Sequence, residues 1–584
     1  MIKHIIRTVS VIFCSLVIFV SCDLTRDPKD RISPESYFKT AEECRLYTNQ
    51  FYSLLPGASA IYSETADYIV GTSLSDEVMG TRVVPSTDGA WNWSALRSMN
   101  FFLDHSNQCE DEAARSMYVG LVRFFRAYFY FEKVKRFGDV PWVDAPLDAN
   151  DPSLYRGRDS RVFVMTKILE DINNAIDNLP EDVSVFSVNK WAALALKTRI
   201  FLFEGTFRKY HGIEGWEDCL DECKDAGRIF LETAPYTIFK EGETPYLDLF
   251  NRLESDQTEI ILSRAYVGSI GLTHDCNGKY LSASMGRPGL TKDIVNSYLL
   301  ADGSRFTDIA NFDKMVFSEE VSGRDPRLAQ SIRTPGYHRK GETTPVAPDF
   351  NATMTGYHLI KYVAESQYDS YNVSEQDLPV FRKGEVCLNY AEACAELGGI
   401  TQSDLDMSVN LLRERVGMPG IDLTWANANP DPYLDKIETG YPGVTGPDKG
   451  VILEIRRERT IELLNEGHRY WDIMRWKAGA RFTRPFHGIY VPNTGTFDLN
   501  GDGEVDLVIY EGDMPTVSGK AAVKSVEELE LSEGNSGKVT VHSEVERVWD
   551  EDKDYLYPIP TEDRVLTQGK ITQNPGWEDG LSFN

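Results

Sequence analysis

The stretch DEAARSMYVGLVRFFRAYFYFEKVKRFG, residues 111–138, decides the fold. Its apolar side chains recur at spacings of three and four residues, which is the period of one face of an α-helix. Gly138 follows the last apolar turn, as is typical of a helix end. The same period marks three later segments, residues 160–180, 188–207 and 216–234. The sequence therefore predicts a mainly α fold in which the helices come in pairs.

The second half of the chain changes character. Residues 235–379 contain Gly and Pro at close intervals and only short apolar runs, which indicates long loops. Helical patterns return at residues 379–399, 403–418 and 450–476, and the strand-like runs of residues 497–513 predict minor β structure. We expect a tetratricopeptide-like scaffold of helical pairs with long binding loops. Because long connections usually carry function, we expect a ligand site in the loops.

An apolar run near the N-terminus stops at Cys22. Basic residues precede the uncharged segment TVSVIFCSLVIFV, which is too short to span a bilayer and has the layout of a secretory signal. Ser21 and Cys22 resemble a bacterial lipobox, in which the cysteine thiol takes a diacylglycerol and becomes the mature N-terminus. The alternative is an ordinary signal with an incidental cysteine. We expect a signal peptide at residues 1–21 and a lipidated tether at residues 22–35.

Composition excludes one class of partner. The 584 residues carry a formal net charge of -29, whereas a nucleic-acid-binding protein needs a clustered basic face that neutralises phosphates. Seven of the nine cysteines lie past Cys22, without the dense spacing of a disulfide framework. We therefore expect no nucleic-acid partner, and we expect most of these cysteines to be buried thiols.

No catalytic constellation stands out. The chain has no G-x-S-x-G elbow and no phosphate-loop spacing of glycines, so we do not expect an enzyme. A sugar-binding site needs aromatic faces beside polar groups, because sugars present both C–H faces and hydroxyls. The stretches SDEVMGTRVVPSTDGAWNWS and GKYLSASMGR offer this combination, although one or both tryptophans could instead belong to the core. The candidate ligand-binding residues are Asp76, Arg82, Trp91, Trp93, Tyr280 and Arg287.

The segment DLNGDGEVD, residues 498–506, resembles a calcium loop. Oxygen-bearing residues fall at alternate positions, and Gly503 occupies the tight sixth position. The pattern fails at the twelfth position, where Ile509 replaces the bidentate glutamate. The alternative is a strand-turn-strand closed by Asp-Gly turn chemistry without an ion. The candidate ligands of a structural calcium ion are Asp498, Asn500, Asp502, Glu504 and Asp506.

Seven motifs in order resemble those of one family. They are FFRAYFYFEKVKRFGDVPWV, RDPRLAQSI, TGYHLIKY, FRKGEVCLNYAEACAELG, NLLRERVGMP, IRRERTIELLNEGHRYWDIMRW and YLYPIPTEDRVLTQGKITQNPGW. Together they resemble the SusD/RagB lipoproteins, surface nutrient-binding partners of TonB-dependent transporters. The resemblance covers nearly the whole mature chain. It implies a helical N-terminal region at residues 36–234 that forms one compact unit with a C-terminal region at residues 235–584.

The resemblance also implies a function. It predicts a lipid-anchored protein at the surface of the outer membrane that captures an oligosaccharide and delivers it to a SusC-like TonB-dependent transporter. A peptide is the alternative nutrient. The residues alone leave two further classes open, namely a secreted hydrolase and a helical scaffold that binds only proteins.

The signature EIRRERTIELLNEG, residues 454–467, also has a structural interpretation. Arg459 and Glu462 lie three residues apart, and further Glu and Arg residues share the helical run. We expect ion pairs along this helix, each worth roughly a few tenths of a kcal/mol when exposed.

Overall fold

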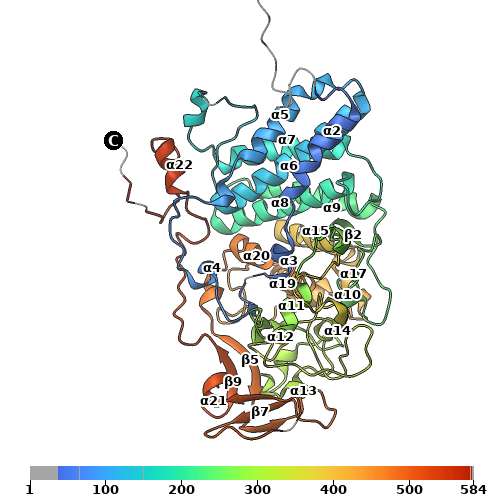
Figure 1. Cartoon of the computed structure of the whole chain (residues 1–584), viewed down its shortest axis with the longest axis vertical. Helices are drawn as coiled ribbons and strands as arrows, with labels where there is room; N and C mark the ends of the chain where they lie inside the picture. The colour runs from blue at the N-terminus through green and yellow to red at the C-terminus, as the bar shows by residue number, and fades with distance from the viewer. Residues whose placement is uncertain (1–36, 65, 149, 518, 579, 582–584) are drawn as a thin grey trace, which may run out of the picture.

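A computed structural model describes residues 37–64, 66–148, 150–517, 519–578 and 580–581. In Figure 1, paired helices fill the upper half of the molecule, and shorter helices, loops and small sheets fill the lower half. The expected signal peptide and the whole of the expected tether, including Cys22, lie outside the described residues. Among the residues described, no helix is both long enough and apolar enough to cross a membrane.

The paired helices form where the sequence predicts them. They are α6 (Glu112–Phe137), α7 (Arg161–Asn178), α8 (Lys190–His211) and α9 (Trp216–Thr233). α7 packs on α6, and α9 packs on α8. At the start of α6 the Asp111 side chain accepts a hydrogen bond from the Ala114 amide, and at its end Gly138 adopts a left-handed φ of +71°. The prediction of a mainly α, helical-pair fold is confirmed.

Shorter helices complete the scaffold. Before α6 they are α2 (Ala41–Thr48), α3 (Ala58–Tyr62), α4 (Asp76–Met79) and α5 (Ser94–His105). After α9 they are α10 (Pro245–Asp248), α11 (Cys276–Leu281), α12 (Lys292–Ser297), α13 (Phe317–Glu320), α14 (Pro326–Ala329), α15 (Lys383–Leu397), α16 (Gln402–Asp406), α17 (Val409–Arg415), α18 (Leu423–Ala428), α19 (Lys449–Glu462), α20 (Arg469–Arg475), α21 (Val526–Leu529) and α22 (Thr561–Leu566). The 3-10 turns are η1 (Asn49–Leu54), η2 (Gly89–Trp91), η3 (Ser106–Gln108), η4 (Pro152–Tyr155), η5 (Gly268–Ile270), η6 (Phe306–Asp308), η7 (Phe312–Lys314), η8 (Ser366–Tyr368) and η9 (Gly479–Thr483).

The β structure is minor, as expected. Three antiparallel pairs join β1 (Ile69–Val70) to β3 (Gly289–Leu290), β2 (Ile260–Arg264) to β4 (Leu378–Arg382), and β5 (Phe486–Val491) to β9 (Gly537–Val541). A three-stranded sheet has the order β6 (Gly495–Phe497), β7 (Leu507–Tyr510), β8 (Ala522–Ser525). In this sheet β7 runs antiparallel to β6 and parallel to β8. β5, β7 and β9 lie at the lower end of the molecule in Figure 1.

The helical run expected at residues 450–476 is two helices. α19 ends at Glu462, and α20 begins at Arg469. Between them Asn465 and Gly467 adopt left-handed φ angles of +58° and +80°. Such residues end a helix without strain, because Gly lacks a Cβ atom and Asn tolerates this conformation.

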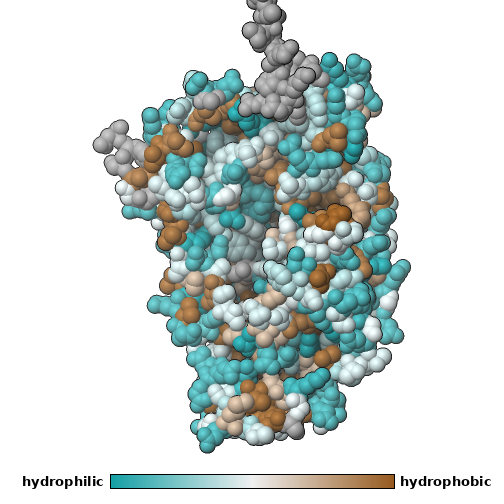
Figure 2. Space-filling view, viewed as in Figure 1, coloured by the Kyte–Doolittle hydropathy of each residue, from teal (hydrophilic) through white to brown (hydrophobic). Residues whose placement is uncertain are grey.

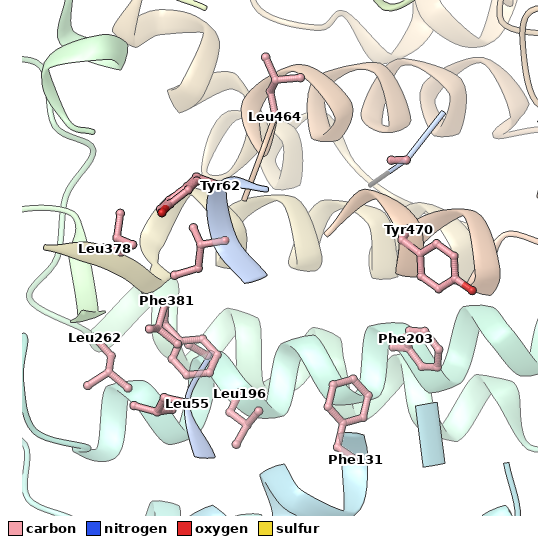
Figure 3. Packing of buried hydrophobic residues seen from close by; sticks show 14 of the residues in the cluster. Leu55, Tyr62, Phe131, Leu196, Phe203, Leu262, Leu378, Phe381, Leu464 and Tyr470 are labelled. Atoms are coloured by element: carbon pink, nitrogen blue, oxygen red, sulfur yellow. The ribbon is translucent and has the colours of Figure 1, made fainter. Parts of the chain in front are cut away.

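One hydrophobic core joins the two halves of the chain. A single cluster of buried side chains extends from Phe38 to Ile571, and a second cluster surrounds α15 and α19. Figure 3 shows Phe131 of α6 beside Phe203 of α8 within the first cluster, and their ring centres are 5.6 Å apart. The seven cysteines of the described part are all buried and free, so the prediction of core thiols is confirmed.

Ion pairs form on α19, as between Arg457 and Glu454, but they are buried rather than exposed. Glu458 and Glu462 are fully buried, and Arg459 pairs with Asp472 of α20 rather than with Glu462. The Glu462 carboxylate instead meets three buried guanidinium groups, those of Arg327, Arg382 and Arg415. Burial alone would raise the pKa of Glu462, but the three guanidinium groups hold that pKa well below its usual range. The sequence period places these residues on a helix but does not reveal that other elements cover the helix.

Candidate functional site

A cavity of about 510 Å³ opens in the upper half of the molecule. It lies between the start of α5, the segment 141–156 and α22, which come from distant parts of the sequence. Its apolar wall includes Trp91, Trp93, Tyr155 and Leu566. Tyr155 is 46% exposed and Leu566 is 69% exposed, so large side chains flank an open mouth. Brown, hydrophobic atoms gather in Figure 2 where Figure 1 places α22.

Two tryptophans of the predicted stretch form one wall of this cavity. Trp91 ends the η2 turn and is nearly buried, and its ring meets those of Trp93 and Phe137 edge-on at 5.3 and 4.8 Å between centres. Trp93 is half-buried. The turn forms because the Asp88 side chain accepts a hydrogen bond of 2.7 Å from the Ala90 amide. Trp91 is therefore a core residue that also lines the cavity, and Trp93 is the more accessible ring.

A lysine from α6 holds this turn in place. Lys133 donates hydrogen bonds to the carbonyl oxygens of Ala90 and Asn92, the latter at 2.8 Å. Its ammonium group also lies 5.2 Å from the centre of the Trp93 ring. Burial lowers the pKa of Lys133 to about 8. The two tryptophans are thus fixed from behind by a cation that contacts both backbone and ring.

Polar groups complete the cavity. Arg97 is exposed at its edge, and within the described ranges no side chain pairs with it. Arg156 is fixed by Asp159 at 2.8 Å and by the Trp142 carbonyl oxygen at 2.6 Å. Burial raises the pKa of Asp563, on α22. Flat aromatic rings beside such groups can stack on the C–H face of a sugar and hydrogen-bond to its hydroxyls.

The first two polar candidates of the sequence analysis lie outside this cavity. Asp76, the first residue of α4, is exposed, and its side chain accepts a hydrogen bond of 2.9 Å from the Thr81 hydroxyl. Arg82 is buried and donates to the carboxylate of Asp554 at 3.2 Å. Its guanidinium lies 4.5 Å from the centre of the Tyr557 ring. Arg82 therefore ties the N-terminal segment to the C-terminal one.

Tyr280 and Arg287 lie at a different place again. Tyr280, on α11, is buried, and its hydroxyl donates a hydrogen bond of 2.7 Å to the Tyr62 carbonyl oxygen. Arg287 has a left-handed φ of +47° and donates to the Phe350 carbonyl oxygen at 2.6 Å. The six predicted residues thus do not line one common cavity; only Trp91 and Trp93 come together.

The predicted calcium loop connects β6 to β7. The Asp498 carboxylate accepts hydrogen bonds from the amides of Gly501 and Gly503 at 2.6 and 2.8 Å, and the Asp506 carboxylate accepts one from the Leu499 amide at 2.7 Å. These contacts close the turn. No group of three or more His, Cys, Asp or Glu side chains is placed to hold a metal ion in the parts of the chain described. The geometry therefore fits the hydrogen-bonded alternative, and calcium binding stays a prediction.

Comparison with known families decides the identity of the chain. A family model described as the SusD family matches residues 258–577, which is more than half of the sequence. The chain belongs to the SusD family. A second model, described as starch-binding associating with outer membrane, matches residues 63–202. The SusD/RagB resemblance seen in the sequence motifs is confirmed.

Individual SusD-like proteins resemble the whole chain. A SusD-like protein of Formosa agariphila, P25, is 24% identical over 527 residues, which cover 81% of this chain and 90% of the relative. A SusD-like protein from Bacteroides fragilis has a solved structure that superposes with a TM-score of 0.68 at 23% identity, covering 94% of this chain and all of that one. A SusD-like carbohydrate binding protein from the same species superposes with a TM-score of 0.64 at 19% identity, covering 91% of this chain and 98% of that one. The solved structures show that this SusD-family chain has their fold.

Sequence reasoning missed several residues of the candidate site in this SusD-family protein. Tyr155 and Asp563 line the cavity with the tryptophans although they are about 60 and 470 residues away along the chain. A local signal existed only for Tyr155, an aromatic residue in a polar stretch between two helices. The loops at residues 235–379, where a ligand site was expected, contribute nothing to the lining of this cavity.

Proposed function

We propose that this SusD-family protein captures an oligosaccharide at the cell surface in the cavity that contains Trp91 and Trp93. The observation that carries the proposal is the meeting of three aromatic side chains, those two and Tyr155, with the polar side chains of Arg97 and Asp563 in one open cavity. Rings stack on the apolar faces of sugars, and polar side chains bind their hydroxyls. A volume of about 510 Å³ accommodates several sugar rings.

The description of the N-terminal family model, starch-binding associating with outer membrane, supports both the ligand class and the location. The name of the carbohydrate binding protein from Bacteroides fragilis supports the ligand class as well. We propose further that Cys22 carries the lipid anchor and that the captured glycan passes to a SusC-like TonB-dependent transporter. These last two steps rest on the sequence motifs.

A binding screen tests the ligand class. The protein without residues 1–22 is applied to an array of oligosaccharides and peptides. Retention on a subset of oligosaccharides supports the proposal. Retention on peptides alone would mean that the ligand is a peptide and not a sugar. Bound oligosaccharides are then recovered and sized by mass spectrometry. Intact chains are expected, because the proposed role is capture; shortened chains would instead indicate a hydrolase.

Fractionation of cells tests the anchor. Two acyl chains hold a protein on a bilayer far more firmly than one, so loss of the modified cysteine should release the protein. Cys22→Ala is expected to be found unprocessed or in the soluble fraction, whereas the wild type stays with the outer membrane and is cleaved by protease added to intact cells. Co-purification of the protein with a SusC-like transporter from the membrane tests whether the two proteins form a complex. Unchanged processing and retention of the variant would refute lipidation at Cys22.

A further inference from the structure

A second, smaller cavity lies away from the tryptophans. It has a volume of about 130 Å³ and is lined by residues of the stretches 62–64 and 66–74, by α11, by residues 286–288 and by the turn between α19 and α20. None of its lining residues belongs to the first cavity. Ser63, Thr72 and Ser73 are among its lining residues, and each carries a hydroxyl group that can donate or accept a hydrogen bond.

One cation of this cavity is unpaired. Lys279 of α11 is half-buried and lines the cavity. In the described part of the chain no carboxylate and no hydrogen-bond acceptor engages its ammonium group. Burial is the only influence that lowers the pKa of Lys279, so no neighbouring charge offsets the loss of water. An ammonium group in this position gains from an anion that enters the cavity.

The backbones of two glycines approach each other closely beside this lysine. A Cβ atom added at Gly286 would lie 3.4 Å from Nζ of Lys279, and one added at Gly71 would lie 2.5 Å from the Gly286 carbonyl oxygen. The amide of Thr72 donates a hydrogen bond of 2.8 Å to that same oxygen. The two backbones therefore meet beside the ammonium group, and a side chain at Gly71 would not fit there.

Two fully buried lysines of the described chain differ from Lys279. Lys292 pairs with Glu320, and Lys361 pairs with Glu466. The one carboxyl group that lines the cavity, that of Glu64, accepts hydrogen bonds from the Tyr68 hydroxyl and from two backbone amides. These three hydrogen bonds stabilise the carboxyl group of Glu64, which forms no ion pair with Lys279.

We propose that this cavity is a second sugar-binding subsite, in which Lys279 takes the acidic group of a uronic acid or of a sulfated sugar. The inference rests on the proposed capture of oligosaccharides and narrows their class to acidic ones. A protein with a net charge of -29 repels anions at long range, so recognition of an acidic glycan depends on a local cation that no carboxylate neutralises. Carboxylate and sulfate offer the same oxyanion chemistry to an ammonium group.

Calorimetric titration with three probes tests the subsite. The probes are tetragalacturonate, a sulfated carrageenan tetrasaccharide and neutral maltotetraose. The wild type is expected to bind at least one acidic probe, and Lys279→Met should weaken that binding by about tenfold to a hundredfold, because a charge-assisted hydrogen bond is lost. Lys279→Arg should retain most of the affinity. The better acidic probe distinguishes carboxylate from sulfate.

The matched control is Lys436→Met, which removes one charge at an exposed lysine that lines neither cavity. It should bind the acidic probe as the wild type does. Melting curves of all variants show that they are folded. Equal acidic binding by wild type and Lys279→Met, or binding of maltotetraose alone, would overturn the subsite and leave the capture of oligosaccharides standing. Binding of no oligosaccharide, here and on the array, would overturn both.

Discussion

The ammonium group of Lys133 lies 5.2 Å from the centre of the Trp93 ring. The same ammonium group donates hydrogen bonds to two carbonyl oxygens of the turn that precedes α5. Lys133 belongs to α6, a helix of 26 residues that packs against α7 and lies in the core. The rigid scaffold therefore positions the aromatic wall of the candidate site directly.

Lys133→Met should lower the affinity for an oligosaccharide found on the array by about tenfold, through loss of order in Trp93 rather than loss of a contact. Methionine keeps the apolar stem but donates no hydrogen bond, so two carbonyl groups lose a partner, at a cost of about 1–3 kcal/mol in folding. Calorimetric titration measures the affinity, and tryptophan fluorescence reports the ring. Lys167→Met, on the exposed face of α7, is the control and should change neither. Unchanged affinity in Lys133→Met would show that the turn holds without the lysine.

Trp93→Ala should weaken glycan binding roughly tenfold and leave the fold intact, because a stacked ring contributes on the order of 1 kcal/mol beyond the area it buries. Trp91→Ala should behave differently. Trp91 is only 3% exposed, so its truncation leaves a hole in the core and costs about 3–5 kcal/mol of stability. The expected result is a lower melting temperature for Trp91→Ala alone. Full affinity of Trp93→Ala would move the glycan to another site.

The elements of the scaffold were predictable because their signals are local. The period of α6, the Asp111 cap and Gly138 lie within 28 residues of sequence, and they suffice to place the helix. The pair Trp91 and Trp93 was also visible, since both rings lie in one polar stretch. Local signals of this kind can be identified in the sequence without knowing which other elements pack against the helix or turn.

The remainder of the site depends on contacts between distant segments. Asp563 reaches the cavity only because α22 returns to the N-terminal half, where Arg82 binds Asp554. The burial of Glu462 likewise follows from the segments that cover α19. A helical period cannot report either fact, because it describes one face of one element and not what packs against that face.

Glu462→Gln should destabilise the protein by about 3–5 kcal/mol, far more than an exposed ion pair would contribute. The substitution keeps the shape of the side chain but removes one of the two carboxylates that the buried guanidinium groups of Arg382 and Arg415 share, so that only Glu259 still pairs with both. The shift in the urea midpoint measures the effect. Glu170→Gln is the matched control, because that glutamate forms an exposed pair with Lys167, and its midpoint should stay nearly unchanged. Equal midpoints for the two variants would contradict the energetic role of the buried cluster.

The turn at residues 498–506 offers a test of calcium. If the ion binds only the folded protein, calcium at about 100 times its Kd adds about 2.7 kcal/mol to stability, so chelation should lower the melting temperature. Asp502→Ala should then remove the difference between the calcium and chelator curves. The hydrogen bonds that the Asp498 carboxylate accepts from the amides of Gly501 and Gly503 are expected to persist in both conditions. Identical curves for the wild type would mean that those bonds close the turn without an ion.

A buried carboxyl group beside the second cavity predicts a pH dependence of stability. Burial raises the pKa of Glu64 to about 7, although hydrogen bonds from Tyr68 and from the amides of Arg469 and Gly467 oppose the shift. In the unfolded chain the pKa of this group has its ordinary value near 4.5. Between these two values the folded protein binds more protons than the unfolded chain does, so the contribution of Glu64 to stability falls as the pH rises.

Glu64→Gln imitates the protonated group and should remove this slope. We expect the stability of the variant, relative to wild type, to improve by on the order of 3 kcal/mol between pH 4.5 and pH 8, because 1.36 kcal/mol corresponds to one pKa unit. Urea midpoints of both proteins, taken at intervals across that range, measure the difference in stability. Because the two proteins share all other titratable groups, the contribution of those groups cancels in this difference. Glu77→Gln is a useful control, since several hydrogen bonds hold the pKa of Glu77 below its ordinary value despite partial burial. Its difference from wild type should already be constant above pH 5. A constant difference for Glu64→Gln as well would mean that the pKa of Glu64 is the same in the folded and unfolded chains, because the hydrogen bonds from Tyr68 and the two backbone amides offset the effect of burial.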